Sequence, residues 1–322
     1  NTCEVYVNGF SSSLPEDVQY KALRKIRGFE NAKMFRPGYA IEYDFFQPTQ
    51  LRPTLETKRV NNLFFAGQIN GTTGYEEAGC QGMIAGINAH LRVTEQEPFV
   101  MKRSEGYIGV LIDDLVNKGT TEPYRMFTSR AEFRILLRQD TADVRLTPIA
   151  QTLGIRGLDK RMEGVRSKLD AHKAIEKFVC KTSVAPDQIN PWLERVGSAP
   201  LKQKVKIESV LLRPKASLEA LSAELPFLGE FLSQYPKEYI DFSENQMKYS
   251  GYIEREKEMA DKMNRLDKVF LPDDFSYDDV QSLSTEAREK LKEIKPRTIG
   301  QASRISGVSP SDISVLLVMC GR

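Results

Sequence analysis

Cysteine and histidine are scarce in this 322-residue chain. The four cysteines form no C-x-x-C pair, so the sequence predicts neither a zinc knuckle nor a disulfide framework, and free thiols in a reducing compartment fit better. With only His90 and His172, histidine-rich metal sites and histidine-based triads are disfavoured, and we expect no bound metal. The cysteines are Cys3, Cys80, Cys180 and Cys320.

Long apolar runs are also missing. No stretch approaches the roughly 20 residues of a membrane-spanning helix, and the chain opens on Asn1-Thr2-Cys3 without a charged-then-apolar leader. We therefore expect no membrane segment, no secretory signal and a cytoplasmic location. Hydrophobic residues at 40% and charged residues at 28% are ordinary for a folded protein, which excludes wholesale disorder.

The net charge of +2 conceals three unlike segments. Residues 1–123 carry 13 basic and 15 acidic side chains, residues 124–215 carry 19 and 10, and residues 216–322 carry 14 and 19. The basic middle segment is a candidate surface for nucleic acid, or an interdomain face paired with acidic neighbours. The acidic last segment argues against groove reading of DNA.

Strand and helix signals alternate over about the first 100 residues, which predicts an α/β arrangement. We expect strands at Glu4–Asn8 and Tyr39–Phe46, and a buried parallel strand at the apolar run Leu63–Ala66. A helix is expected to open at Pro15-Glu16-Asp17.

Helical patterns replace this alternation from Tyr107 onward. We expect an apolar helix ending at Gly119, a charged amphipathic helix over Asp159–Val179 with a solvated basic face, and Trp192 as a packing anchor. Lys202, Lys204 and Lys206 alternate after a proline-rich hinge. After a boundary at Arg213-Pro214-Lys215, an all-helical module is predicted, with helices at Ser217–Glu224, about Phe242–Val269, Thr285–Glu293, Ile299–Ile305 and Ser311–Met319.

The most informative stretch is Gly67–Gly82. A strand end leads into a loop whose Gly71 and Gly74 permit positive φ and close approach of a ligand, and a helix then runs to about Leu91. We expect Thr72 or Thr73 to cap this helix. Small residues at helical spacing leave one face without bulk: Ala78, Gly82, Ala85, Gly86 and Ala89.

This loop has two interpretations. One is a tightly packed turn without a ligand, and the other is a helix N-terminus whose free N–H groups bind an anionic or carbonyl-rich ligand. Phosphate loops are absent, because no G-x-G-x-x-G occurs and the only G-x-x-x-x-G, Gly74 with Gly79, is followed by Cys80 instead of Lys. A planar carbonyl-bearing ring such as a flavin pyrimidine fits better than a pyrophosphate.

Three arginines follow at a spacing of four. Arg130, Arg134 and Arg138 share one face if the segment is helical, and like charges there repel unless an anion binds them. The anion is either a phosphate or a set of carboxylates, and both alternatives stand on the residues alone. The candidate carboxylates are Glu132, Asp140 and Asp143.

Three strings resemble the glucose-inhibited division protein A (MnmG) family. They are the flavin-loop string AGQINGTTGYEEA at Ala66–Ala78, the string EPYRMFTSRAEFR at Glu122–Arg134 and the string IGQASRISGV at Ile299–Val308. The strings are long and specific, and the resemblance spans the chain. It implies an FAD-dependent tRNA-modifying enzyme of the bacterial cytoplasm or of mitochondria, homodimeric in full length.

The resemblance also implies a reaction. With a GTPase partner (MnmE), the family adds a carboxymethylaminomethyl or aminomethyl group to C5 of the wobble uridine. Methylenetetrahydrofolate supplies the carbon, glycine or ammonium supplies the amine, and NADH reduces the flavin.

The chain departs from the family in what it lacks. Members begin with a G-x-G-x-x-G Rossmann strand and carry an inserted nicotinamide-binding domain and proposed catalytic cysteines, none of which is present. The resemblance therefore implies that the chain is the C-terminal half of a member, inactive by itself. None of its cysteines lies in the expected motif, so no catalytic residue is assigned.

Site residues follow from the resemblance. It implies tRNA contacts at Arg125, Arg130, Arg134 and Arg138. It implies an α/β remnant of an FAD-binding domain over 1–100, a basic tRNA-facing region over 101–215 and a helical domain over 216–322 that docks partner and tRNA. The implied flavin contacts are Gly67, Gln68, Ile69, Asn70, Gly71, Thr72, Thr73, Gly74, Tyr75 and Glu76.

Two alternatives stay open. The chain by itself is a non-catalytic fragment that binds tRNA and a partner protein, or it belongs to a folate- and FAD-dependent tRNA uridine methyltransferase. The methyltransferase shares the flavin loop but is expected to lack a helical module like residues 217–322, which favours the first family.

Overall fold

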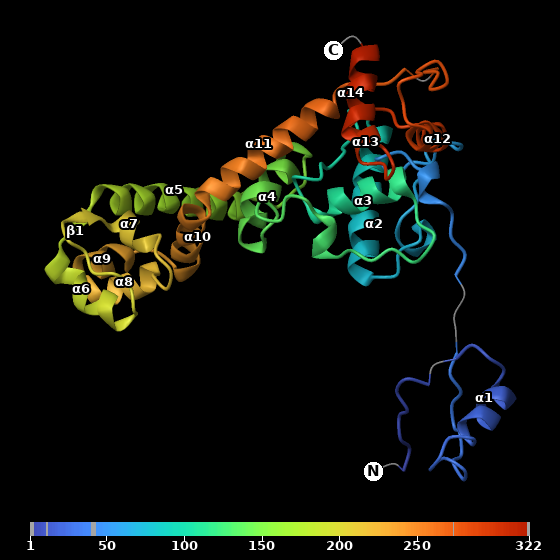
Figure 1. The fold of residues 1–322 in the computed structure, drawn as a ribbon, viewed down its shortest axis with the longest axis horizontal. Coiled ribbons are helices and arrows are strands. Elements are labelled where there is room, and N and C mark those ends of the chain that lie inside the picture. The colour runs from blue at the N-terminus through green and yellow to red at the C-terminus, as the bar shows by residue number, and fades with distance from the viewer. Residues whose placement is uncertain (1–2, 11, 40–42, 273, 321–322) are drawn as a thin grey trace. The chain divides into compact units, whose positions relative to one another are not determined.

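Helix dominates the computed structural model, which describes residues 3–10, 12–39, 43–272 and 274–320 (Figure 1). The chain divides into two compact units, Asn1–Phe46 and Gln47–Arg322. Among the described residues, no helix has the length and apolar character needed to cross a bilayer.

The first unit is organised by one buried amide. Its helix α1, Glu16–Leu23, follows Pro15 at the N-cap as the sequence predicts. On α1, Gln19 is 2% exposed, and its Nε2 donates to the carbonyls of Leu14 (2.6 Å) and Gly38 (2.9 Å). Its Oε1 accepts the Gly38 N–H at 2.8 Å. The loops on both sides of α1 are therefore tied to the helix by a single side chain.

The strands expected in the first 100 residues are corrected by the structure. Glu4–Asn8 has no strand, Tyr39–Phe46 includes residues outside those described, and Leu63–Ala66 has only an isolated antiparallel bridge between Glu56 and Phe64. A buried parallel strand needs a hydrogen-bonded ladder along its length, whereas this run makes only local antiparallel bonds, from the Thr57 N–H to the Leu63 carbonyl and from the Phe65 N–H to the Leu55 carbonyl. Leu63 is 40% exposed and the other three residues are half-buried, so the prediction was wrong in burial as well as in pairing.

The start of the second unit packs two helices and four short 3₁₀ helices around a small core. That core contains buried side chains from the segment after Pro48 and from both helices: Leu51, Leu55, Ile84, Ala85, Ile112 and Val116. Helix α3 ends at Lys118, and Gly119 follows with a φ of +67°, a positive value that favours glycine, which confirms the predicted stop. The elements are η1 (Pro48–Gln50), η2 (Gly67–Asn70), α2 (Tyr75–Val93), α3 (Tyr107–Lys118), η3 (Thr128–Arg130) and η4 (Gln139–Thr141).

A helical module follows, and it contains the one two-stranded sheet of the described residues. The strands pair antiparallel in the register Ser183↔Lys206 and Val184↔Val205. The module core is apolar and includes Trp192 at 7% exposure, which confirms the packing role predicted for this residue. The elements are α4 (Ala142–Thr152), α5 (Asp159–Lys181), β1 (Ser183–Val184), α6 (Pro186–Arg195), β2 (Val205–Lys206), α7 (Ile207–Leu211), α8 (Leu218–Glu224), α9 (Pro226–Leu232) and α10 (Lys237–Lys248).

The core of this module continues across Arg213-Pro214-Lys215. Leu211 lies before this tripeptide and Leu218 after it, and both are fully buried in one cluster. The tripeptide is thus a turn within a single core.

The long helix predicted over Phe242–Val269 is two helices, α10 and α11 (Ser250–Leu266). The bend lies at Tyr249, just before Ser250 and Gly251, a pair that commonly interrupts helices. Helix α11 runs from α10 toward a small C-terminal bundle (Figure 1). The bundle consists of α12 (Thr285–Ile294), α13 (Ile299–Ser303) and α14 (Pro310–Met319), which confirms the last three predicted helices.

Candidate functional site

The loop before α2 is closed by backbone geometry rather than by a side-chain cap. Gly71 follows η2 with φ +78°, and Gly74 is the N-cap of α2 without a side-chain hydrogen bond. The expectation that Thr72 or Thr73 caps this helix is therefore wrong. The Thr72 hydroxyl is buried and donates to the Gly67 carbonyl at 3.0 Å instead, while Thr73 is exposed.

Gln81, which the sequence did not single out, organises the loop from inside. It is fully buried on α2, and its Oε1 accepts from the Gly67 N–H at 3.2 Å and from Asn70 Nδ2 at 2.7 Å. Its Nε2 donates to Thr72 Oγ1 at 2.9 Å. The sequence did contain a signal for this role of Gln81, which lies among the small residues of α2. Small neighbours on a helix face let a long polar side chain reach an adjacent loop.

Glu77 joins this loop to the Glu122–Arg134 string. Its carboxylate is buried, accepts the Met126 N–H at 2.9 Å and forms an ion pair with Arg125 Nε at 3.6 Å. Beside it, the Tyr124 N–H donates to the Gly71 carbonyl at 2.8 Å. A Cβ at Gly74 would lie 1.5 Å from Glu77 Oε2, so only glycine leaves room for this carboxylate.

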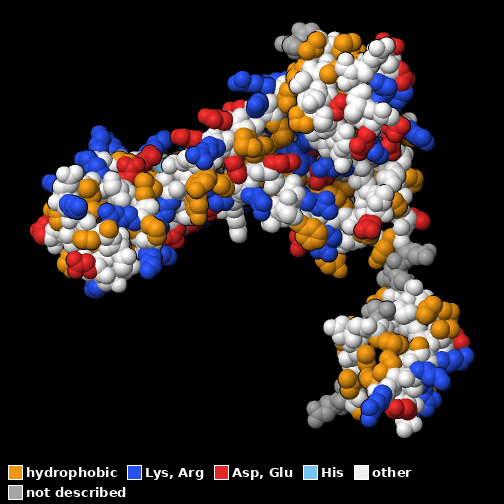
Figure 2. All heavy atoms as spheres, viewed as in Figure 1, with side chains coloured by type: hydrophobic (Ala, Val, Ile, Leu, Met, Phe, Trp, Pro, Cys, Tyr) orange, Lys and Arg blue, Asp and Glu red, His pale blue; other side chains and the backbone are white. Residues whose placement is uncertain are grey.

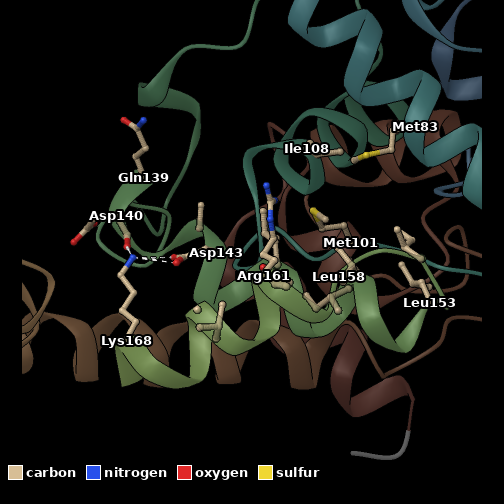
Figure 3. Close-up of a pocket in the computed structure, with 18 of the residues that line it drawn as sticks. Met83, Met101, Ile108, Gln139, Asp140, Asp143, Leu153, Leu158, Arg161 and Lys168 are labelled. Carbon is tan, nitrogen blue, oxygen red and sulfur yellow. Dashed lines mark hydrogen bonds and ion pairs between the residues drawn. The ribbon is translucent and has the colours of Figure 1, made fainter. Parts of the chain in front are cut away.

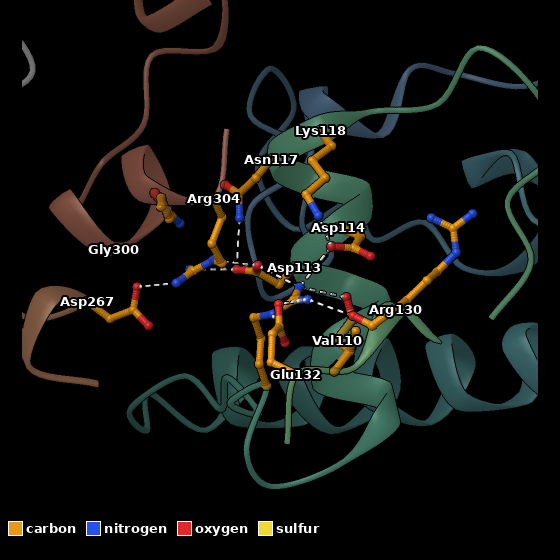
Figure 4. A network of polar contacts seen from close by, with 12 residues as sticks. Val110, Asp113, Asp114, Asn117, Lys118, Arg130, Glu132, Asp267, Gly300 and Arg304 are labelled. Atoms are coloured by element: carbon orange, nitrogen blue, oxygen red, sulfur yellow. Dashed lines mark hydrogen bonds and ion pairs between the residues drawn. The ribbon is translucent and has the colours of Figure 1, made fainter. Parts of the chain in front are cut away.

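A buried network of arginines and aspartates contacts the Tyr124 hydroxyl, and Figure 4 shows its aspartates Asp113 and Asp114 on α3. The Tyr124 hydroxyl donates to Asp114 Oδ2 at 2.9 Å, and Arg103 Nη1 donates to Asp114 Oδ1 at 2.8 Å. Arg103 also pairs with Asp113 at 3.0 Å and Glu132 at 2.7 Å. We call these groups, with Asp267 and Arg304 below, the arginine–aspartate network.

Arg304 brings the third string into the same network. It pairs with Asp113 of α3 at 2.8 Å and with Asp267, which follows α11, at 2.9 Å (Figure 4). A Cβ at Gly300 would lie 2.0 Å from Asp267 Oδ1, so the start of α13 packs directly on this carboxylate. The three strings, far apart in the chain, are therefore joined through α3.

Burial and neighbouring charges shift the pKa values of three groups in the network. Burial and the neighbouring Asp114 raise the pKa of Tyr124, so its hydroxyl stays a donor. Burial alone would raise the pKa of Asp114, but hydrogen bonds and charges from Lys118 and Arg103 lower it below the ordinary value. Burial raises the pKa of Asp267 against the opposing effect of Arg304.

The four arginines implied to contact tRNA lie in two places. Residues 131–138 are not helical, so the helical face that Arg130, Arg134 and Arg138 would share does not form. Arg125 pairs with Glu77, and the Arg130 guanidinium stacks 4.2 Å from the Tyr124 ring centre. Arg138 pairs with Asp140 at 2.9 Å and lies over Tyr249, whereas Arg134 is exposed without an ion pair among the described residues.

A large apolar pocket of about 1070 Å³ lies between α2, α4, α5 and α10. Figure 3 shows Met83, Met101 and Ile108 on one side and Lys168 with Asp143 at the other end. Lys168 is 2% exposed and pairs with Asp143 (3.0 Å) and Glu238 (2.8 Å), so the solvated face expected for α5 does not include this lysine. Burial alone would lower its pKa, but these carboxylates raise it.

Two polar atoms of the flavin-loop string are buried without a hydrogen-bond partner among the described residues, Gln68 Nε2 and Asn70 Oδ1. The loop is otherwise sharply divided, since Asn70 and Thr72 are buried and Tyr75 is 94% exposed. Cys80 lies on α2 about one turn after Glu76 and Glu77. Burial and these two carboxylates raise the pKa of its thiol, which disfavours the reactive thiolate form.

Three family models match the chain. Glucose inhibited division protein A matches residues 1–97, the tRNA modifying enzyme MnmG/GidA C-terminal helical domain matches 159–257, and the MnmG/GidA C-terminal helical bundle matches 259–322.

Relatives match over the whole chain. The tRNA uridine 5-carboxymethylaminomethyl modification enzyme MnmG of Christiangramia forsetii is 59% identical, with 100% of this chain and 52% of the relative covered. The enzyme of the same name from Cytophaga hutchinsonii is 57% identical with the same coverage. The structure of Aquifex aeolicus GidA in the form II crystal is 41% identical, has a TM-score of 0.76, and covers 100% of this chain and 50% of that one.

The chain thus spans about half the length of the curated relatives it matches, including their C-terminal helical regions. The three strings that the structure joins through α3 lie within the matched sequence. The chain belongs to the MnmG/GidA family and corresponds to its C-terminal half.

Proposed function

We propose that this chain is the flavin-loop and helical part of an FAD-dependent tRNA-modifying enzyme. That enzyme adds a carboxymethylaminomethyl or aminomethyl group to C5 of the wobble uridine of certain tRNAs. The observation that carries the proposal is the union of the flavin-loop string with the arginine string, where Tyr124 bonds to Gly71 and Arg125 pairs with Glu77. The names of the relatives support the reaction.

The flavin-loop residues fit the polar edge of a flavin ring. A buried polar group without a partner costs about 1–3 kcal/mol, and Gln68 Nε2 and Asn70 Oδ1 are two such groups on one short segment. In α2 the first N–H bonded to a backbone carbonyl belongs to Ala78, which leaves the earlier N–H groups available to an acceptor. When bound, FAD supplies the redox chemistry, and Gln68 with these N–H groups binds and orients its ring.

The remaining flavin contacts and the domain roles belong to the same proposal. Gly67–Glu76 forms the cofactor side, residues 1–100 are the remnant of the FAD-binding domain, 101–215 face tRNA, and 216–322 dock partner and tRNA. Arg125, Arg130 and Arg134 are the proposed phosphate contacts, since all three are exposed. Arg138 contributes less, because Asp140 already neutralises it.

The whole enzyme would act as a homodimer in the cytoplasm with a GTPase partner. NADH would reduce the flavin, and methylenetetrahydrofolate would supply the carbon. The folate-dependent methyltransferase alternative is disfavoured, because the two MnmG/GidA helical models match residues 159–257 and 259–322.

Mass spectrometry of tRNA from cells lacking the gene tests this proposal. We expect the modified wobble uridine to disappear and to return when the intact gene is supplied. Unchanged tRNA would contradict the proposed reaction. In the complemented strain, Gln68→Leu should impair restoration, whereas Gln151→Leu, exposed on α4, should restore the modification fully.

A further inference from the structure

We propose that five lysines, at the C-terminal end of α5 and on and just before strand β2, bind the sugar–phosphate backbone of the tRNA. This inference rests on the proposed function and adds a contact surface outside the flavin loop and the arginine string. We call this group the α5–β2 lysine cluster: Lys177, Lys181, Lys202, Lys204 and Lys206.

Backbone geometry brings four of these lysines together, and Lys202 lies in a bend two residues before Lys204. The β1–β2 register places Lys206 opposite Ser183, two residues after Lys181, and Lys206 Nζ donates to the Lys181 carbonyl at 2.7 Å. Lys177 lies one turn earlier on α5. Because side chains alternate along an extended segment, Lys204 projects on the same side as Lys206, while Ile207 is fully buried.

The cluster forms no ion pairs with described carboxylates, although Glu176 and Glu208 lie near Cys180, which directly precedes Lys181. All five side chains are exposed. Other lysines of the same module do pair, since Lys173 meets Asp170 at 3.3 Å and Lys237 meets Glu219 at 2.8 Å. The helix macrodipole favours cations at the end of α5, which accounts for Lys181 but not for Lys202 and Lys204. Gathering unpaired cations of one sign suits a polyanion.

The surroundings favour a nucleic-acid backbone over bases. Between residues 159 and 240 the only large apolar side chain with high exposure is Leu212, and no aromatic ring is highly exposed there. Base recognition on single strands uses exposed aromatic rings for stacking, whereas phosphate contacts need only cations. Figure 2 shows lysine and arginine side chains distributed over the surface of this module. We therefore expect affinity without base specificity.

Binding of tRNA to the 322-residue chain at several salt concentrations tests the cluster. The cluster variant carries Lys177→Gln, Lys181→Gln, Lys202→Gln and Lys204→Gln, and keeps Lys206 because of its bond to α5. We expect at least about a 10-fold loss of affinity. The slope of log K against log salt is negative, and its magnitude should decrease by about 3, since each phosphate contact contributes roughly 0.7–0.9.

A matched control removes the same charge from exposed lysines that already pair with carboxylates. It carries Lys173→Gln, Lys237→Gln, Lys290→Gln and Lys292→Gln. It should keep the wild-type slope, and Lys→Arg changes at the four cluster positions should retain affinity.

Equal losses in the cluster variant and the control, or an unchanged slope in the cluster variant, would overturn the inference. The proposed reaction would survive either outcome, because it is tested by tRNA modification in cells. Polyglutamate and unlabelled RNA are compared as competitors of tRNA binding to the cluster. If polyglutamate competes as strongly as RNA, the cluster binds an acidic protein partner instead, and the inference would be overturned.

Discussion

The helical module of residues 159–257 and the joint between α3 and α13 are held by different forces. The module buries a continuous apolar core that runs from Ile175 to Met247. The joint instead buries charges, with Arg103 and Arg304 placed between Asp113, Asp114 and Asp267.

This difference separates the regions that stabilise the fold from the contacts that fix the relative positions of its parts. Apolar burial is non-directional and tolerates small shifts, whereas an arginine between carboxylates accepts few geometries. The charged joint also contacts Tyr124, whose N–H binds the flavin loop at Gly71. We infer that the module core supplies stability, and that the network fixes the position of the flavin loop relative to the C-terminal bundle.

Removing the central cation should have the largest effect. Arg103 is 4% exposed, and Arg103→Leu leaves the buried Asp114 with only the half-exposed Lys118 as an ion-pair partner, while Asp113 keeps Arg304. We expect a loss of about 3–5 kcal/mol, typical of breaking a buried pair from one side. Thermal and denaturant unfolding measure it. Lys118→Leu is the control, because Lys118 is 44% exposed and should lose much less; equal losses would show that burial is not decisive.

A cavity in the module core should give a somewhat smaller effect of a different kind. Leu193 is fully buried, and Leu193→Ala should destabilise the chain by about 2–5 kcal/mol through lost apolar contacts and the cavity left behind. The loss should not depend on salt or on pH between 3 and 6, roughly the range of carboxyl titration. A salt-dependent loss would break the proposed distinction between the two regions.

Acid should act selectively on the network. The folded pKa of Asp114 lies below its ordinary value of 3.8, so its contribution is present above that value and is lost as the pH falls through the folded pKa. The raised pKa of Asp267 acts in the opposite sense and partly offsets this. Melting temperatures should therefore show the difference between wild type and Asp114→Asn shrinking below pH 3.8, while the Leu193→Ala difference stays constant. A constant Asp114→Asn difference would contradict the assigned charge states.

A local change within the C-terminal bundle should have the smallest effect. The Ser309 hydroxyl caps α14 by accepting the Asp312 N–H at 3.2 Å, and Ser309→Ala should cost about 0.5–2 kcal/mol. Hydrogen exchange should increase at the start of α14 and remain unchanged at Tyr124. Faster exchange at Tyr124 would mean that any destabilisation of the bundle also loosens the flavin loop. The arginine–aspartate network would then have no special role in coupling them.

Local signals in the sequence predicted local structure well. A helix ended at Gly119 as predicted, the helix predicted over Ser311–Met319 begins one residue earlier at Pro310, and Gly71 before α2 has the expected positive φ. Strands were predicted poorly at Glu4–Asn8 and Leu63–Ala66, since a strand depends on neighbours that one segment cannot reveal.

The candidate site was predicted only in part, for a similar reason. The glycines of the flavin-loop string predicted a loop that a ligand can approach closely. Nothing in the spacing of Arg103, Asp113 and Arg304 indicated that they meet, because their contacts cross up to 191 positions of sequence. The regular spacing of Arg130, Arg134 and Arg138 was misleading, since it fits a helix that the chain does not form there.

Hydrogen exchange at Tyr124 and Met126 in the Arg304→Gln variant tests the central claim most directly. Both N–H groups bind the flavin-loop region, at Gly71 and Glu77, while Arg304 lies in the C-terminal bundle. The control is Arg288→Gln, whose guanidinium binds carbonyls within the bundle. Coupling through α3 predicts faster exchange at both groups in Arg304→Gln only; wild-type exchange rates in that variant would contradict it.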